Sequence, residues 1–410
     1  MAKQNKPAIR FKGFTDAWEQ RKLSEIADKV TEKNAGLQYI ETFTNSAEFG
    51  IISQRDFFDH DIAKMSSLSG YYIVRNEDFV YNPRISTSAP VGPINRNKLG
   101  RIGVMSPLYT VFRPHDVDTT YLEYFFKSKY WHSFMNFNGD SGARSDRFSI
   151  KDSVFFEMPI PLPYIEEQRK IGEHLTQLDH LITLHQRKYD KLQVLKKAML
   201  EKMFPKNGSS VPEIRFEGFT DAWEQRKLSE IAGKVTEKNT GLQYVETLTN
   251  SAEFGIISQR DFFDHDISKL GSLDGYYIVR NEDFVYNPRI STSAPVGPIN
   301  RNKLGRTGVM SPLYTVFRPH DIDTTYLEHF FKCGYWYSFM NFNGDSGARS
   351  DRFSIKDDVF FQMPIPVPHI EEQRKIGLFL TQLDHLITLH QRELEKLQNI
   401  KKSMLEKMFV

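Results

Sequence analysis

The sequence predicts two mixed α/β (α+β) heads, each followed by one long helix, and three observations carry this prediction. First, residues 9–204 recur as residues 214–409, with about 27 of the 196 aligned positions different. Second, each copy contains short β-branched and aromatic segments bounded by Pro and Gly, which is typical of strands. Third, each copy ends in about 39 residues with a 4-3-4-3 apolar spacing, which is typical of a coiled-coil helix. A repeat of this length indicates two copies of one structural unit.

Bulk composition limits the function classes. The 410 residues carry a formal net charge of +2, so contact with nucleic acid requires local basic patches rather than a generally basic chain. The single cysteine, Cys333, excludes a disulfide framework and a cysteine metal site and fits a reducing cytoplasm. No apolar stretch has the length of a signal peptide core or a membrane span. We therefore expect a soluble, cytoplasmic protein.

The first head is predicted from strand and helix signals. Residues 73–82 and 108–114 predict strands. Thr120 and Glu123 form a capping-box pattern, which predicts one helix from this point to Asn138–Gly139. The proline-rich residues 158–163 then end the head. The second copy repeats all of these signals, including Thr325 and Glu328 in the capping box.

The long helix of the first copy is expected over residues 164–204. Its apolar seam needs a partner, and the nearest is the seam of the second copy, because the second head lies between the two helices in sequence. We expect an antiparallel coiled coil, with the heads at opposite ends and related by an approximate two-fold axis. The alternative is that each seam packs on its own head. The predicted interface residues are Ile171, Leu175, Leu178, Ile182, His185, Leu192, Ile376, Leu380, Leu383, Ile387, His390 and Leu397.

These elements give five expected segments. Residues 1–160 form the first head and residues 161–204 the first helix. Residues 205–213 form a polar Pro/Gly/Ser linker. Residues 214–365 form the second head, and residues 366–410 form the second helix.

Catalytic signatures are mostly missing. There is no G-x-x-x-x-G-K-[ST] loop and no G-x-G-x-x-G after a strand. Asn82-Pro83-Arg84 superficially suggests the Asn-Pro-Pro-aromatic loop of amino-methyltransferases, but Arg84 replaces the second proline. His174, His180 and His185 do not share one helix face, so no metal site is expected. We expect no catalytic residue on this chain.

The segment from residue 79 to residue 115 carries the functional signal. It holds five cations, Arg84, Arg96, Lys98, Arg101 and Arg113, and no Asp or Glu. Arginine favours phosphate and guanine, and asparagine favours adenine. A single arginine is most often a solvated or ion-paired surface residue, but five without a counter-charge in one segment, repeated in the second copy, favour DNA binding.

A second loop, residues 138–152, adds arginines on a Gly/Ser-rich turn. The predicted DNA-binding residues of the first copy are Arg84, Ser86, Thr87, Asn95, Arg96, Lys98, Arg101, Arg144 and Arg147. Those of the second copy are Arg289, Ser291, Thr292, Asn300, Arg301, Lys303, Arg306, Arg349 and Arg352.

Both copies share a set of local motifs. FxGFTDAWEQRKL opens each head, PLPYIEEQRKI (161–171) enters the first helix, and LTQLDHLI (175–182) lies in its seam. With these motifs the chain resembles, over essentially its whole length, the specificity subunit of a type I restriction-modification system. The resemblance implies that each head is a target recognition domain that reads half of a bipartite DNA site. It further implies that the antiparallel helices fix the gap between the half-sites and dock two methyltransferase (modification) subunits.

The resemblance also assigns the chemistry to partner subunits. S-adenosylmethionine is expected on the methyltransferase subunits, and ATP and Mg on the restriction/translocase subunits. This chain is then a non-catalytic subunit without a cofactor of its own. The alternative functions are a stand-alone, repressor-like protein that binds a specific DNA sequence, and a coiled-coil adaptor that binds no DNA.

The near identity of the two heads departs from the family's usual pattern of dissimilar heads. Residues 79–115 differ from their counterparts at one position, Ile102 against Thr307. Equal heads related by a two-fold axis predict an interrupted inverted repeat, whereas a translational arrangement predicts a direct repeat. Four differences cluster at Tyr124/His329, Ser128/Cys333, Lys129/Gly334 and His132/Tyr337. If that helix entered the DNA groove, the two half-sites would diverge.

Overall fold

The computed structural model describes residues 6–58, 65–141, 146–206, 208–263, 270–346 and 351–409. The chain forms two compact units, one of residues 1–186 with residues 392–410 and one of residues 187–391. Each unit holds one head together with parts of both long helices, so the units do not coincide with the two consecutive sequence repeats. Among the described helices, none is long and apolar enough to cross a membrane.

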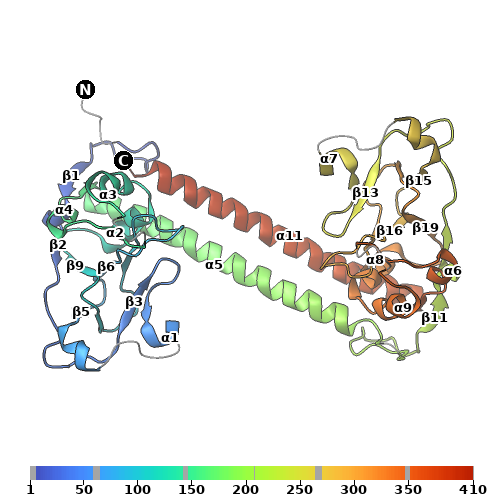
Figure 1. The fold of residues 1–410 in the computed structure, drawn as a ribbon, viewed down its shortest axis with the longest axis horizontal. Helices are drawn as coiled ribbons and strands as arrows, with labels where there is room; N and C mark the ends of the chain where they lie inside the picture. Colours follow the sequence, from blue (N-terminus) through green and yellow to red (C-terminus); the bar gives the residue numbers. More distant parts are fainter. Residues whose placement is uncertain are drawn as a thin grey trace. The chain divides into compact units, whose positions relative to one another are not determined.

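Unit 1 contains the first head (Figure 1, blue to green). Its strands are β1 (Glu19–Lys22), β2 (Ala27–Lys29), β3 (Phe43–Ser46), β4 (Gly50–Ser53), β5 (Tyr72–Val74), β6 (Phe79–Tyr81), β7 (Ile94–Arg96), β8 (Gly103–Met105), β9 (Thr110–Pro114) and β10 (Pro159–Leu162). Its helices are η1 (Leu23–Glu25), α1 (Gln54–Phe58), η2 (Met65–Gly70), α2 (Thr119–Lys127), α3 (His132–Asn138) and α4 (Asp152–Phe155), followed by the long α5 (Ile165–Lys202).

Unit 2 repeats this order (Figure 1, yellow to red). Its strands are β11 (Glu224–Lys227), β12 (Ala232–Lys234), β13 (Leu248–Ser251), β14 (Gly255–Ser258), β15 (Tyr277–Val279), β16 (Phe284–Tyr286), β17 (Ile299–Arg301), β18 (Gly308–Met310), β19 (Thr315–Pro319) and β20 (Pro364–Val367). Its helices are α6 (Leu228–Ile231), α7 (Gln259–Phe263), η3 (Leu270–Gly275), α8 (Thr324–Cys333), α9 (Tyr337–Asn343) and α10 (Asp357–Phe360), followed by the long α11 (Ile370–Lys407).

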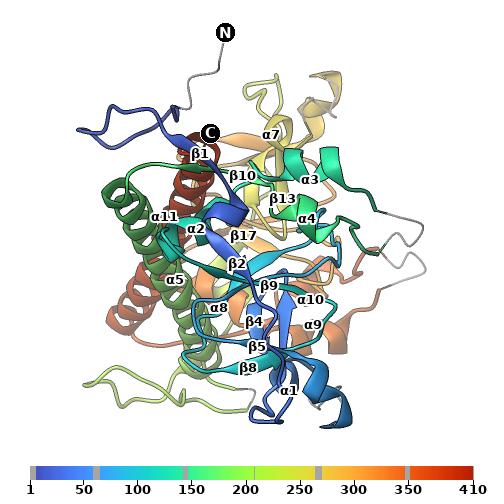
Figure 2. The ribbon, with the colours of Figure 1, turned by 90° about the vertical axis from the view of Figure 1, so that its left-hand side faces the viewer.

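Each head is built on a four-stranded antiparallel sheet, in the order β2-β9-β6-β7 in unit 1 and β12-β19-β16-β17 in unit 2. In unit 1, Phe79 of β6 lies opposite Phe112 of β9 on one side and Arg96 of β7 on the other. Three two-stranded ladders complete the head: β1-β10, β3-β4 and β5-β8. Figure 2 shows β1 beside β10, the strand that leads directly into α5. This ladder therefore ties the start of the head to its end.

The strand and helix predictions for the head need two corrections. The predicted strand over residues 73–82 is two strands, because a turn with Glu77 in the left-handed region (φ 72°) separates β5 from β6. The single helix predicted from Thr120 is two helices, α2 and α3. Its N-cap is Asp118, whose side chain accepts a hydrogen bond from the Tyr121 N–H, so the capping-box assignment to Thr120 was wrong. The predicted end is confirmed, since α3 stops at Asn138 with Gly139 as its C-cap.

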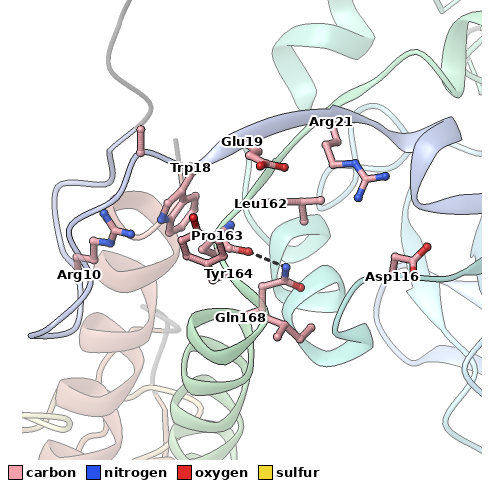
Figure 3. A pocket seen from close by; sticks show the side chains of 11 residues that line it. Arg10, Trp18, Glu19, Arg21, Asp116, Leu162, Pro163, Tyr164 and Gln168 are labelled. Atoms are coloured by element: carbon pink, nitrogen blue, oxygen red, sulfur yellow. Dashed lines mark hydrogen bonds between the residues drawn. The ribbon is translucent and has the colours of Figure 1, made fainter.

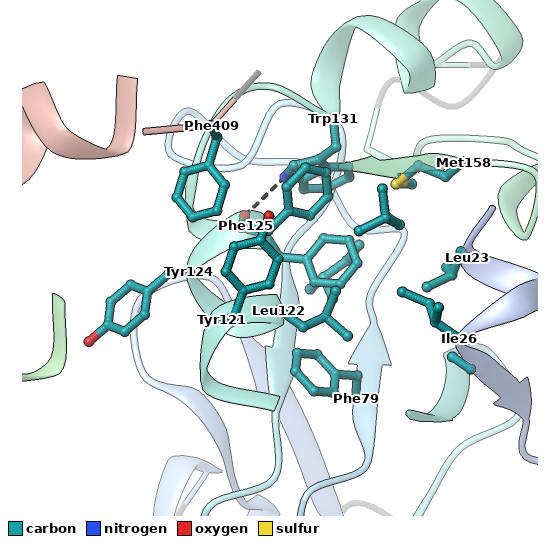
Figure 4. Packing of buried hydrophobic residues seen from close by; sticks show 14 of the residues in the cluster. Leu23, Ile26, Phe79, Tyr121, Leu122, Tyr124, Phe125, Trp131, Met158 and Phe409 are labelled. Atoms are coloured by element: carbon teal, nitrogen blue, oxygen red, sulfur yellow. Dashed lines mark hydrogen bonds between the residues drawn. The ribbon is translucent and has the colours of Figure 1, made fainter. Parts of the chain in front are cut away.

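Helix α2 lies within one apolar cluster of the head. Figure 4 shows its apolar residues packed near Phe79 of the sheet, with Tyr124, also a member of the cluster, on the side opposite Leu23 and Ile26. The cluster also contains Phe409, at the end of the chain, which packs 5.5 Å from Tyr121 between ring centroids. Tyr121, Leu122 and Phe125 are fully buried. α2 is therefore the element through which the sheet contacts the long helices.

The long helices α5 and α11 lie where the sequence predicts them. The apolar seam of each helix makes two kinds of contact. Ile171, Leu175 and Leu178 of α5 are buried in the core of the head that precedes them, and Leu397 and Ile400 of α11 pack against the same cluster. In unit 2 the corresponding cluster holds Ile376, Leu380 and Leu383, with Leu192 and Met199 packed against it. Each seam therefore packs on its own head and also on a segment of the other long helix. A coiled coil over the full helix length stays a prediction.

Candidate nucleic-acid interface

Most cations of the basic segment in head 1 face carboxylates that come from outside that segment. Residues 79–115 contain no Asp or Glu, but the fold brings in Glu41, Glu77 and Asp78 from upstream and Glu123 from α2. The ion pairs are Arg96 with Glu77 (2.9 Å) and Glu123 (2.6 Å), Lys98 with Glu123 (2.8 Å), Arg101 with Glu41 (2.8 Å) and Arg113 with Asp78 (2.8 Å). The expected uncompensated charge of +5 is therefore wrong for the folded head.

Head 2 repeats this compensation. The ion pairs are Arg301 with Glu282 (2.9 Å) and Glu328 (2.7 Å), Lys303 with Glu328 (2.6 Å), Arg306 with Glu246 (2.7 Å) and Arg318 with Asp283 (2.7 Å). The sequence contained one signal for this arrangement, namely the acid-rich residues Glu77-Asp78 directly before the basic segment. The contribution of α2 depends on tertiary structure alone.

Glu123 holds Arg96 in a buried ion pair rather than at a surface. The side chains of Arg96 and Glu123 are only 9% and 7% exposed. Burial by itself raises the pKa of the Glu123 carboxyl, but the neighbouring Lys127 and Lys98 ammonium groups outweigh it and lower that pKa to about 2. Arg96 also donates to the Thr119 hydroxyl at 2.8 Å. These contacts favour a structural role for Arg96, and its assignment to DNA binding stays a prediction without geometric support.

Arg84 and Arg147 form the basic feature that remains. They lie opposite each other in an isolated antiparallel bridge. The flanking hydrogen bonds run from the Ile85 N–H to the Asp146 carbonyl (3.0 Å) and from the Phe148 N–H to the Pro83 carbonyl (2.7 Å). Two bonds placed on either side of the pair define the non-hydrogen-bonded position, where cross-strand side chains are closest and share one face. Both arginines are exposed, and neither has an ion pair with any described residue.

Arg289 and Arg352 repeat this arginine pair in head 2. Their bridge is flanked by the Ile290 N–H bond to Asp351 O (3.0 Å) and the Phe353 N–H bond to Pro288 O (2.8 Å). Like charges directly opposite each other on two strands destabilise the pairing by roughly 0.2–1 kcal/mol. An anion placed between the two guanidinium groups would remove that repulsion. Because guanidinium groups are favoured donors to phosphate and to base edges, the paired arginines are the candidate nucleic-acid contact of each head.

A network of asparagine amides holds the strand that carries Arg84. The Asn82 side-chain amide nitrogen donates to the Asn45 backbone carbonyl at 2.8 Å. The Asn82 side-chain oxygen accepts from the Arg84 backbone N–H at 3.0 Å. Asn45 is 1% exposed and its side chain donates to the Val80 carbonyl at 2.7 Å. Asn95 in turn donates to the Asn45 side-chain oxygen at 2.7 Å. Asn95 and its counterpart Asn300 are thus part of the scaffold, and the buried Asn45 is the central residue of that scaffold, which sequence reasoning missed.

The loop after Arg84 presents small hydroxyl side chains. Ser86 and Ala89 exchange two backbone hydrogen bonds (3.0 and 3.1 Å), and the Ser86 hydroxyl lies 3.2 Å from that of Ser88. Ser86 and Thr87 are exposed, as are Ser291 and Thr292 in head 2. They can add hydrogen bonds to a ligand that the arginine pair holds. Arg144 and Arg349, also predicted from sequence, lie outside the described residues.

A cavity borders the arginine pair in both heads. In unit 1 it has a volume of about 380 Å³ and is lined by Arg147, Pro83 and three tyrosines, Tyr72, Tyr81 and Tyr109. In unit 2 the cavity beside Arg352 has a volume of about 560 Å³. Burial raises the pKa of Tyr81 above its usual range, and its hydroxyl donates to the Val91 carbonyl at 2.9 Å. The cavity wall also carries the Lys29–Asp152 ion pair, so its charged groups compensate each other beside the arginine pair.

A second cavity in unit 1, of about 210 Å³, lies at the start of α5 and shares no lining residue with the first (Figure 3). Arg10 on its wall is held by the buried Glu167 at 2.7 Å, and Gln168 donates to the Pro163 carbonyl at 2.8 Å. The buried Trp18 indole N–H has no hydrogen-bond partner among the described residues. The Arg10–Glu167 ion pair connects the head to α5, and Arg21 on the same wall is paired with Glu25 of the head.

On the α2–α3 segment, the difference between Tyr124 and His329 lies at a buried position rather than at the surface. Tyr124 and Ser128 are buried, at 3% and 4% exposed, and the Tyr124 hydroxyl donates to Asp179 of α5 at 2.8 Å. His329 in unit 2 is 1% exposed and lies 3.2 Å from the Thr381 hydroxyl. Tyr124 and His329 contact the long helices, so this difference does not alter a surface that could read DNA.

Comparison with known proteins identifies the family. The family model described as the type I restriction modification DNA specificity domain matches residues 15–194 and again residues 220–399. The chain belongs to this family. Each match spans one head and most of the helix that follows it, so the sequence repeat corresponds to two specificity domains.

Relatives of this family extend the comparison. The type I restriction enzyme MjaVIII specificity subunit of Methanocaldococcus jannaschii is 25% identical over 324 residues, covering 75% of this chain and 73% of the relative. The putative type I restriction enzyme MjaX specificity subunit of the same organism is 26% identical over 275 residues, covering 63% and 60%. The crystal structure of the type I restriction-modification S subunit from M. genitalium matches with a TM-score of 0.56 at 13% identity, covering 99% of both chains. This match shows that the two chains share a fold over nearly their whole lengths.

Proposed function

We propose that this chain reads the DNA target sequence for a type I restriction-modification complex and that each head contacts DNA through its arginine pair. The single observation that carries the role of the site is the geometry of Arg84 and Arg147, two exposed guanidinium groups at the closest cross-strand position without a carboxylate partner among described residues. Family membership supplies the class of ligand. Arginine binds phosphate bidentately and binds the guanine edge in the same way, so the pair suits both backbone and base contacts.

The target is proposed to be an interrupted inverted repeat of two equal half-sites. Equality follows from the identity of residues 79–115 in the two heads at all positions except Ile102, whose side chain packs on the Leu68, Ile73 and Val104 cluster. Inversion follows if the long helices pair antiparallel. In unit 1 the first half of α5 meets the last turns of α11 through an Asp179–Lys401 ion pair, and in unit 2 Lys196 meets Asp384. These contacts support the antiparallel sense.

The long helices are proposed to set the gap and to dock two methyltransferase subunits. Leu181 and Leu184 of α5 are 40% and 39% exposed, and the equivalent Leu386 and Leu389 of α11 are 41% and 48% exposed. Large exposed apolar residues that recur on equivalent helix faces are typical of protein interaction surfaces. In this proposal S-adenosylmethionine binds the methyltransferase subunits, ATP and Mg bind the restriction/translocase subunits, and this chain supplies no catalytic residue and no cofactor.

The test uses the chain co-expressed with its methyltransferase subunits. Sequencing of methylated bases in the host DNA identifies the motif, and binding to that motif and to scrambled DNA is then measured over a salt series. The double variant Arg84→Ala with Arg289→Ala should lose target-specific binding, and Arg147→Ala with Arg352→Ala should do the same. If the arginines bind phosphates, the salt slope should fall by about one for each lost contact.

Arg101→Ala with Arg306→Ala is the matched control. Like Arg84 and Arg289, these two arginines are exposed, and the side chains of Arg101 and Arg306 are 46% and 49% accessible. Each, however, is paired with a glutamate in its own head. The control should retain the target preference of the unchanged complex. Equal affinity of the unchanged complex for target and scrambled DNA would contradict the proposed function, and an asymmetric motif would contradict the inverted repeat. Tight target binding by the chain without partner subunits would support the stand-alone alternative.

A further inference from the structure

A ladder of alternating charges connects the sheet of each head to the long helices. In unit 1 it runs from Arg96 on β7 to Glu123 on α2 (2.6 Å), from Glu123 to Lys127 (2.7 Å), and from Lys127 to Asp179 on α5 (3.9 Å). Asp179 ends the ladder in an ion pair with Lys401 on α11. We call these five residues the charge ladder.

Unit 2 contains the same ladder. Arg301 contacts Glu328 at 2.7 Å, Glu328 contacts Lys332 at 2.9 Å, and Lys332 contacts Asp384 at 3.8 Å. Asp384 pairs with Lys196 of α5. The central glutamate is 7% exposed in both units. Buried ion pairs add little net stability compared with apolar replacements, but removing one partner is strongly destabilising because it leaves an uncompensated buried charge.

Two further contacts fix the direction of α2 along α5. The Asp118 N–H at the start of α2 donates to the Gln168 side chain at 2.9 Å. One turn later α5 carries Gly172, where an added Cβ would lie 3.1–3.2 Å from Thr120 and the Tyr121 nitrogen. The backbones of α2 and α5 are therefore in close contact at one end of α2. The charge ladder holds the other end, so α2 is fixed at two points.

The ladder also leads to the DNA-binding strand. Arg96 ends β7, which pairs with β6, and β6 continues into the Asn82–Arg84 segment. Asn95, next to Arg96, donates to the Asn45 side chain that anchors this segment. A rotation of α2 on α5 would therefore carry the arginine pair with it, because sheet and helix are joined through a buried carboxylate.

We propose that Glu123 and Glu328 are positioning residues that determine which gap length between half-sites the complex accepts, while leaving the choice of bases unchanged. This inference rests on the proposed function. A change of one base pair in the gap moves the second half-site by about 3.4 Å along the DNA and rotates it by about 34–36°. A head whose angle to its helices is locked cannot follow that displacement, whereas a head with a loosened ladder can.

The two units differ at one rung, which provides an internal comparison. In unit 1 the Tyr124 hydroxyl donates to Asp179 at 2.8 Å, and the Lys127 ammonium lies 4.7 Å from the centre of the Tyr124 ring. In unit 2 His329 replaces this tyrosine and contacts the Thr381 hydroxyl. Its Nδ1 is buried and has no partner among described residues. The ladder of unit 1 therefore has one more link to Asp179 than the ladder of unit 2 has to Asp384.

The first experiment measures the head angle without DNA. In a Cys333→Ser background, spin labels are attached at Glu48→Cys on the exposed β3–β4 turn and at Gln177→Cys on the exposed face of α5, both within unit 1. Electron–electron dipolar distances are then recorded for the full chain. Glu123→Gln should broaden or shift the distance distribution, Tyr124→Phe should do so to a smaller degree, and Glu41→Gln, which breaks an ion pair inside the head, should leave it unchanged.

The second experiment measures gap selectivity in the complex with methyltransferase subunits. Substrates carry the motif found for the unchanged complex, with the gap shortened or lengthened by one base pair. Glu123→Gln with Glu328→Gln should raise methylation of the altered gaps by about tenfold or more, the discrimination expected of one well-made contact, while the bases read stay the same. Glu41→Gln with Glu246→Gln is the matched control.

The outcomes separate this inference from the proposed function. An unchanged distance distribution together with unchanged gap selectivity overturns the inference, even if the arginine variants lose DNA binding as expected. Changed bases in the motif also overturn it. If the glutamate variants do not fold, Tyr124→Phe and His329→Tyr decide, since they should respectively relax and tighten gap selectivity. If every arginine variant keeps its preference for the target sequence, the proposed function is contradicted, whatever the distances show.

Discussion

His329→Tyr should stabilise unit 2, because it restores in that unit the contact that Tyr124 makes in unit 1. The surroundings are equivalent: Thr381, Asp384, Lys332 and Lys196 stand where unit 1 has Thr176, Asp179, Lys127 and Lys401. The substitution adds a hydrogen bond to a carboxylate, with a typical net value of about 1.5–3 kcal/mol. It also removes a buried, unpartnered Nδ1, which costs roughly 1–3 kcal/mol. Because such terms do not add fully, we expect a gain of about 2–4 kcal/mol at pH 7.

The gain should grow as the pH falls. Burial, together with the nearby Lys332 ammonium, lowers the pKa of His329 to about 3, although Glu328 and Asp384 act in the opposite direction. The unfolded chain has a histidine pKa near 6.5, so between pH 6.5 and pH 3 the unfolded state binds a proton that the folded state does not. The free energy of unfolding of unit 2 therefore decreases as pH falls through this window. From pH 7 to pH 5 the loss is about 2 kcal/mol, and His329→Tyr should abolish it.

Hydrogen exchange measured by mass spectrometry tests both statements, because peptides from the two units are followed separately in one sample. His329→Tyr should raise the opening free energy of unit 2 amides and leave those of unit 1 unchanged. Tyr124→His is the reverse control, and it should weaken unit 1 and give it the same pH dependence. An unchanged or lowered opening free energy for His329→Tyr, or a pH dependence that persists in it, would refute the reasoning.

Three further predictions concern stability and the loop that carries the arginine pair. Gly92→Ala should destabilise unit 1 by about 3 kcal/mol or more in a urea titration, because Gly92 has φ +82° and an added Cβ would lie 2.1 Å from the Asn82 carbonyl. Gly100→Ala is the control. Gly100 has φ +69° but open space around it, so this substitution should cost only about 1–2 kcal/mol. Asn45→Ala should cost about 2–3 kcal/mol, since it removes the buried side-chain amide that donates to the Val80 carbonyl and accepts from the Asn95 side chain, and circular dichroism during urea titration would measure the loss. Glu123→Gln should make unfolding less sensitive to acid between pH 4.5 and pH 2, because the lowered pKa of Glu123 contributes stability only above this window and loses it as pH falls through it.

Several features could be predicted from local sequence because they depend on neighbouring residues. The long helices appeared in the 4-3-4-3 apolar spacing, and the end of α3 appeared in Asn138–Gly139. The beginning of α2 was misplaced because Asp118 and Thr120 both fit an N-cap, and only the hydrogen bond from Tyr121 to Asp118 decides between them. The break between α2 and α3 was missed because the aromatic run continues across it with no proline or glycine in the first copy.

The candidate site was located from sequence only in part. Arg84 and Arg147 were among the predicted residues, but so were Arg96, Lys98 and Arg101, which face carboxylates from other elements. A count of charges along one segment cannot include these partners, since they are brought in by strand pairing and by the packing of α2. The same limit explains why Asn45 was not predicted, because its hydrogen bonds with Val80, Asn82, Pro93 and Asn95 all join residues at least 35 positions away.

The sequence by itself determined that the protein consists of two nearly equal heads with two long helices, because repetition and periodicity are properties of the chain. The tertiary structure decided which arginines keep an unpaired charge and which are locked in ion pairs, because that depends on the carboxylates brought to each guanidinium in space. It also decided that each compact unit combines one head with parts of both long helices. That arrangement places Tyr124 and His329 against α5 and α11 and turns a difference between the repeats into a difference between the two head–helix contacts.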